Sequence, residues 1–140
     1  MNWNPLDRSN YFKALLILIG MDKRLSIEEK KKFRQIGVLL GFDKKFTEEA
    51  MNNLFDNEHI IYAPPKFSNS IIAANCVKVG IHLASTDKNL CQTELNWLRS
   101  IARKNILSKE WFNSELNNCR KQNNISDSDF LFEIDELFAL

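Results

Sequence analysis

The sequence predicts an all-helical fold of about seven helices, built as two similar three-helix halves followed by a C-terminal helix. Three observations carry this prediction. Apolar residues recur at three- and four-residue spacing in almost every segment, strand signals are absent, and one motif is written twice at an offset of 65 residues. With 140 residues the chain has the length of one domain, which we assign to 1–140 with repeats at about 10–57 and 68–121.

Three helices are predicted in the first half. The first ends near Gly20, and Gly41 stops the second. Ser26 and Glu29 form a capping box at the start of the second helix, in which hydroxyl and carboxylate each satisfy an unpaired backbone N–H. Candidate caps of the first and third helices are Asp7 or Ser9, and Asp43 or Thr47. The apolar residues of the three helices include Tyr11, Phe12, Leu15, Leu16, Phe33, Ile36, Gly37, Leu40, Phe46, Ala50 and Leu54.

The second half follows the same plan. Its first helix starts at Ser68 and is apolar around its whole circumference, so we expect it at the centre of the molecule. The next helix covers 92–104, and another starts at Ser108. A final helix over 126–139 presents apolar residues on one side and acidic residues elsewhere. The apolar residues include Ile72, Cys76, Val77, Val79, Ile81, Leu83, Leu95, Leu98, Ile101, Ala102, Trp111, Phe112, Leu116, Phe130, Ile134, Leu137 and Phe138.

The repeated motif lies between the first and second helices of each half and reads DKRLSIEE at 22–29 and DKNLCQTE at 87–94. The leading Asp can accept hydrogen bonds from the backbone of its own turn, and the final Glu complements the positive end of the next helix. Farther along, the same offset pairs Phe33 with Leu98. The sequence therefore predicts equivalent interior positions for these two residues.

This arrangement resembles the TerB-like domains, a family named for tellurite-resistance proteins. The resemblance implies an all-helical fold of about seven helices with an internal duplication, and it suggests a setting in stress response. In the family, the acidic residues of the motif form surface clusters that have been suggested to bind divalent metal. Carried over to this chain, the candidate metal ligands are Asp22, Glu29, Asp87 and Glu94.

The four acidic residues have two interpretations. Turn closure and helix capping explain all of them and require no cofactor. The alternative is a divalent-metal-binding or sensing domain. Hard cations take six or more oxygen ligands, so two carboxylates in each half would need water or carbonyl oxygens to complete a site.

Composition excludes several classes of function. A net charge of +1 supplies no overall field for recruiting nucleic acid or an anionic membrane. The three cysteines are odd in number and lack Cys-x-x-Cys spacing, so they indicate neither a disulfide framework nor a zinc site and favour a reducing, cytoplasmic location. The apolar run at 14–19 is far too short to span a bilayer, which argues against membrane insertion.

Catalytic constellations are also missing, because the chain has no phosphate-binding glycine loop, no nucleophile elbow and no His-Glu-x-x-His. We therefore predict a non-enzymatic interaction or scaffolding module with an unidentified protein partner. Trp97 aligns with Lys32, which lies on an outer face, so we expect an exposed indole that anchors a partner beside Arg99 and Arg103. In the alternative, the acidic C-terminal helix folds over Trp97.

Overall fold

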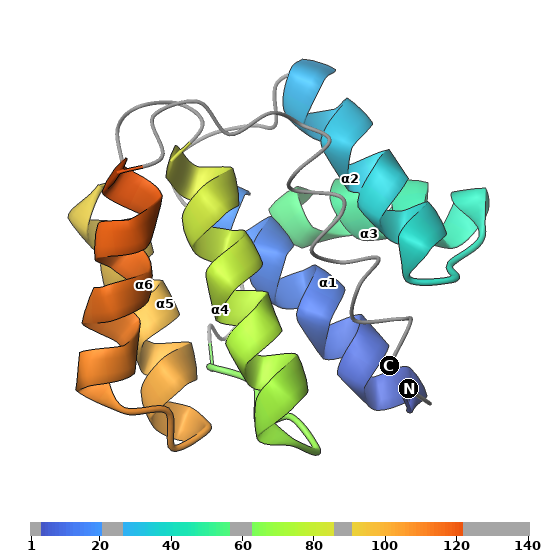
Figure 1. Ribbon diagram of the computed structural model, residues 1–140. Coiled ribbons are helices and arrows are strands. Elements are labelled where there is room, and N and C mark those ends of the chain that lie inside the picture. The colour runs from blue at the N-terminus through green and yellow to red at the C-terminus, as the bar shows by residue number, and fades with distance from the viewer. Residues whose placement is uncertain (1–3, 21–26, 57–62, 86–90, 122–140) are drawn as a thin grey trace.

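The protein is all-helical in the computed structural model, which describes residues 4–20, 27–56, 63–85 and 91–121 (Figure 1). Its helices are α1 (Pro5–Gly20), α2 (Ile27–Leu39), α3 (Lys44–Asp56), α4 (Ser70–Ser85), α5 (Gln92–Lys104) and α6 (Lys109–Lys121). No strand occurs within these described ranges. The predicted fold class is confirmed, and the seventh helix expected over 126–139 lies outside the described residues.

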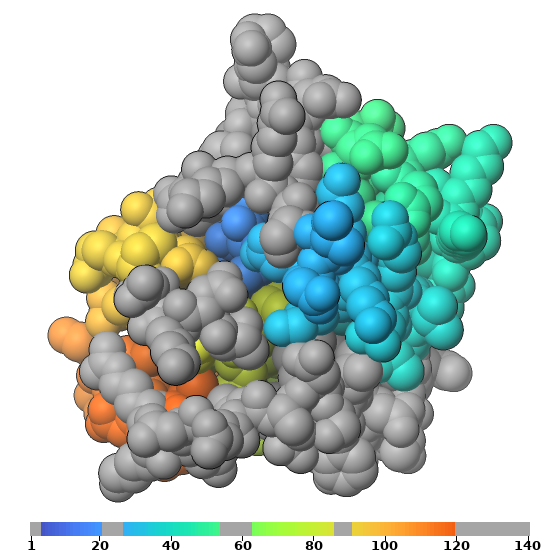
Figure 2. Space-filling view, turned by 90° about the horizontal axis from the view of Figure 1, so that it is seen from above, coloured from blue at the N-terminus to red at the C-terminus, as the bar shows by residue number. Residues whose placement is uncertain are grey.

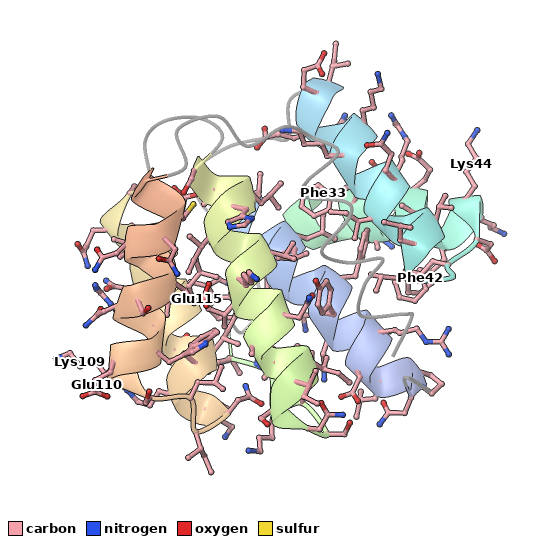
Figure 3. All side chains as sticks on the ribbon, viewed as in Figure 1. Phe33, Phe42, Lys44, Lys109, Glu110 and Glu115 are labelled. Atoms are coloured by element: carbon pink, nitrogen blue, oxygen red, sulfur yellow. The ribbon has the colours of Figure 1, made fainter. Side chains whose placement is uncertain are left out.

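The six helices repeat at a single offset along the chain. Adding 65 to both bounds of α1, α2 and α3 gives the bounds of α4, α5 and α6. The predicted interior pair is buried in both halves, since Phe33 is 0% exposed and its counterpart Leu98 is 1% exposed. Lys44 and Lys109, the first residues of α3 and α6, both project outward, whereas Phe33 points into the first half (Figure 3). The two predicted three-helix halves are therefore present.

Equivalent asparagines cap the first helix of each half. The Oδ1 atom of Asn4 accepts a hydrogen bond of 2.7 Å from the backbone N–H of Asp7. The Oδ1 atom of Asn69 accepts one of 2.9 Å from the N–H of Ile72. Both bonds satisfy an amide of the first turn that has no partner within the helix.

These starts correct two predicted boundaries. The first helix does not begin at a cap formed by Asp7 or Ser9, because Asn4 caps it and Pro5 occupies the first helical position, where its missing N–H costs nothing. Asp7 instead lies buried in α1, and its carboxylate accepts hydrogen bonds from the hydroxyl and, at 3.0 Å, from the N–H of Ser68. Ser68 thus precedes the helix that it was expected to start.

The caps predicted at Asp43 and Ser108 are confirmed, whereas Ser26 of the predicted capping box lies outside the described residues. The Oδ1 atom of Asp43 accepts a hydrogen bond of 2.7 Å from the N–H of Phe46. At the equivalent place, the Oγ atom of Ser108 accepts one of 3.0 Å from the N–H of Trp111. Chemically different side chains therefore perform the same capping function in the two halves.

The central element is α4, which packs against α1, α5 and α6 (Figure 1). A Cβ atom at Gly80 would lie 2.6 Å from Leu98 Cδ2, so the glycine permits close approach of α5. The same position would lie 3.7 Å from Leu15 Cδ2, and Leu15 is the counterpart of Gly80 in the first half. A residue that contacts its own counterpart marks a two-fold axis, so the pseudo-symmetry axis passes where α1 and α4 cross.

The second helices of the two halves are packed differently. Helix α5 contacts both α4 and α1, whereas its counterpart α2 contacts α1 and α3 and does not contact α4. Seen from above, α5 and α6 lie on one side of the molecule, and α2 and α3 lie on the other (Figure 2). The two halves therefore agree in the bounds of their helices but differ in how these helices pack.

Helices α2 and α5 end in the same type of turn, in which a backbone N–H donates to the carbonyl five residues earlier. These bonds run from Phe42 to Gly37 and from Leu107 to Ala102, and both measure 2.9 Å. The turn needs a left-handed residue, which is Gly41 in the first half, with φ 82°, and Ile106 in the second, with φ 58°. An isoleucine in this conformation costs about 1–3 kcal/mol, because its Cβ crowds the backbone.

Replacing Ile106 by glycine should therefore stabilise the protein. We expect Ile106→Gly to raise the free energy of unfolding by about 1 kcal/mol, and the melting temperature by about 2–4 °C, in chemical and thermal denaturation. Ile106→Ala is the matched control, since it removes the exposed side chain but keeps the Cβ. Equal stability of the glycine and alanine variants would show that the backbone is not strained.

Candidate partner-binding surface

The acidic residues predicted as metal ligands fall only partly within the described residues. Asp22 and Asp87 lie outside them. Glu29 is half-buried in the first turn of α2. Glu94 is half-buried in the first turn of α5, where its Oε1 atom accepts a hydrogen bond of 3.2 Å from the backbone N–H of Cys91. This contact agrees with the capping interpretation of Glu94, and no group of three side chains suited to metal ligation occurs in the described part of the chain.

Metal binding can be tested by melting the protein with Ca²⁺, Mg²⁺, Mn²⁺ or Zn²⁺. If the four carboxylates only close turns and cap helices, the melting temperature should be the same with and without each ion, because a ligand that binds the native state raises it. The control is the double variant Asp22→Asn with Asp87→Asn. An ion-dependent rise that this variant abolishes would establish the metal site.

Trp97 does not lie on the surface. Its side chain is 5% exposed, and its Nε1 atom donates a hydrogen bond of 3.0 Å to the backbone carbonyl of Ala14 in α1. The expected exposure of Trp97 is therefore wrong. The alignment with Lys32 misled for two reasons: Lys32 is half-buried and does not lie on an outer face, and α5 packs against α1 as well as α4, which buries the equivalent position.

Arg99 and Arg103 occupy different surroundings from Trp97. The guanidinium carbon of Arg99 lies 5.5 Å from the ring centroid of Phe112, a cation–π contact between α5 and α6. Arg103 is exposed near the end of α5. Trp97 thus lies in the core, Arg99 between α5 and α6, and Arg103 on the surface. The three residues predicted to bind a partner do not form one patch.

Three large apolar side chains are exposed around the segment that leads into α4. Leu6 is 68% exposed, Ile71 53% and Ile106 86%. Leu6 and Ile71 are counterparts in the first turns of α1 and α4. The starts of these helices and the α5–α6 turn all lie at the lower end of the molecule in Figure 1. We call these three residues the apolar end.

Asn105 fixes the backbone beneath the apolar end. Its buried side chain donates from Nδ2 to the carbonyls of Pro65 at 2.8 Å and Ile101 at 2.9 Å. Its Oδ1 atom accepts a hydrogen bond of 2.8 Å from the N–H of Phe67. One amide thus ties the segment before α4 to the turn that carries Ile106, while Asp7 holds the same segment from α1.

Positive charge borders the apolar end. Lys66 lies in the segment before α4, and Lys104 and Lys109 flank the α5–α6 turn. All three are exposed. Lys109 and Glu110 project from the start of α6, so one carboxylate accompanies these cations (Figure 3). The surface therefore offers apolar contact with a mostly basic rim.

The cysteines do not provide reactive groups in the core. Cys76 and Cys119 are buried, and desolvation raises the pKa of the Cys76 thiol far above its usual range. A thiol in this environment stays protonated at neutral pH, so it is a poor nucleophile and a poor metal ligand. The sequence indicated no functional role for these two cysteines, and their burial indicates that they are core packing residues.

Comparison with known proteins identifies no relative: no protein-family model, curated protein or solved structure matches the chain. Among the described residues, no helix combines the length and apolar character needed to cross a membrane.

Loss of the Asn105 amide should destabilise the protein strongly. We expect Asn105→Ala to lower the free energy of unfolding by about 2–4 kcal/mol, because it removes three hydrogen bonds and leaves the buried Phe67 N–H without its acceptor. The control is Asn96→Ala, which removes an exposed bond to Gln92 and should change stability by less than about 0.5 kcal/mol. Similar losses in the two variants would contradict a fixing role for Asn105.

Proposed function

We propose that the chain is a non-enzymatic protein-interaction module of TerB-like type and that a protein partner docks on the apolar end. The observation that supports this most is Ile106, which combines an 86% exposed side chain with a φ of 58°. The conformation costs stability, and the exposed side chain recovers little of it through burial. Gly41 fills the equivalent position without either penalty, so a binding role would account for the isoleucine.

The chemistry of the surface favours an apolar partner segment with acidic residues beside it. Leu6, Ile71 and Ile106 would supply the desolvated centre, and Lys66 and Lys104 would lie at the rim. Rim charges chiefly increase the association rate and are screened by salt. Binding through this surface should therefore weaken moderately as ionic strength rises.

This proposal keeps the predicted protein partner and changes its location. The interaction was expected at Trp97, whose indole is buried and bonded to α1. The apolar end replaces it as the working surface. A stress-related setting remains part of the proposal on the strength of the TerB-like resemblance of the repeated motif, and a cytoplasmic location on the strength of the cysteine pattern.

The variant Ile106→Gly separates binding from stability, because it should make the fold more stable and the partner complex weaker. Affinity capture from cells that express the chain would compare wild type, Ile106→Gly and Ile27→Ala. Ile27 is 83% exposed at the start of α2, so its variant controls for general loss of surface apolarity. We expect recovery of the partner to fall at least about tenfold for Ile106→Gly, the effect of losing a contact of roughly 1.4 kcal/mol.

Recovery should stay at the wild-type level for Ile27→Ala. If Ile106→Gly and wild type captured the same proteins in equal amounts, the apolar end would not be the docking surface.

A further inference from the structure

The segment 63–69, which we call the strap, joins the three elements that carry the apolar end. Asp7 of α1 is 2% exposed, and both of its carboxylate oxygens accept hydrogen bonds from Ser68. One bond comes from the backbone N–H at 3.0 Å and the other from the hydroxyl. Asn105 binds the strap from the α5–α6 turn, and the strap leads directly into α4. The contact between Asp7 and Ser68 therefore links the starts of α1 and α4.

Ser68 is exposed although its hydroxyl is bonded to a buried carboxylate. No residue of the strap is helical, so an enzyme can take up Ser68 without unwinding a helix. The strap contains Lys66 two residues before Ser68 and no acidic residue. Protein kinases select their substrates partly by such charge patterns. Phe67 is buried, so uptake requires a brief local opening of the strap.

We propose that Ser68 is the substrate of an ATP-dependent protein kinase and that its phosphorylation opens the strap. In the reaction, a bond forms between the γ-phosphorus of ATP and the Oγ atom of Ser68. The bond between that phosphorus and the bridging β-phosphate oxygen breaks, and ADP leaves. The hydroxyl proton passes to a base of the kinase.

The phosphate would disrupt the contact with Asp7 in two ways. The Oγ atom loses the proton that it donates to the carboxylate, and a group with a charge of about −1.5 to −2 is placed beside a buried negative charge. Release of the strap would separate Leu6 on α1 from Ile71 on α4. Phosphorylation would thereby prevent docking at the apolar end. This last consequence rests on the proposed function, whereas the modification and the opening do not.

Mass spectrometry tests whether the modification occurs. The full chain is incubated with ATP and an extract of cells that express it, and is then digested with trypsin. The peptide 67–78 contains both Ser68 and Ser70, so its fragment spectra show which serine carries the phosphate. We expect phosphate on Ser68 and its loss from this peptide in Ser68→Ala. A peptide without phosphate, or with phosphate on Ser70 alone, overturns the proposal.

A melting cycle tests whether the phosphate acts through Asp7. Phosphoserine incorporated in place of Ser68 during synthesis should lower the melting temperature of the full chain by about 4 °C or more. In Asp7→Asn, which keeps the shape of the side chain without its charge, the same phosphate should lower it by less than about 1 °C. Equal decreases in the two backgrounds, or no decrease in either, would overturn the proposal.

Neither measurement requires the partner of the apolar end. If capture of the partner were the same for Ile106→Gly and wild type, the proposed docking surface would fail, and the phosphorylation of Ser68 would still be decided by these two tests.

Discussion

The crossing of α1 and α4 is the contact on which the rest of the structure depends. These are the most apolar helices, and each is the first element of its half. Leu15 of α1 packs against Gly80 of α4, so the two helices are in close contact at the pseudo-symmetry axis. Leu98 reaches into the same place from α5. Because protein interiors are close-packed, this small space fixes how the halves sit against each other.

The two halves agree more closely in backbone geometry than in side-chain chemistry. The turn after α2 and the turn after α5 have the same hydrogen bonds, although their left-handed residues are Gly41 and Ile106. Their neighbours also differ, since Leu40 packs in the core while its counterpart Asn105 binds the segment before α4. Equivalent positions thus make different contacts in the two halves.

Local signals in the sequence predicted the six described helices and their offset, although not the starts of α1 and α4, because apolar periodicity and capping act within a few residues. The interior pair Phe33 and Leu98 followed from the same pattern. Surface exposure was not predictable in this way. Trp97 occupies an outer position by alignment, and only the tertiary packing of α5 on α1 places it inside. Ile106 was missed because a left-handed position at a helix end is usually signalled by glycine, and an isoleucine there gave no signal of its unusual conformation.

The rigid turn that carries Ile106 affects the entropy that this residue would lose on binding another molecule. Its turn is held by backbone hydrogen bonds to the carbonyls of Ile101, Ala102 and Arg103 and by the side-chain amide of Asn105, and a β-branched side chain has few rotamers to lose. Contact with such a residue requires little ordering of either backbone or side chain. Association through a preorganised group of this kind loses less conformational entropy, so a small contact area can still support specific recognition.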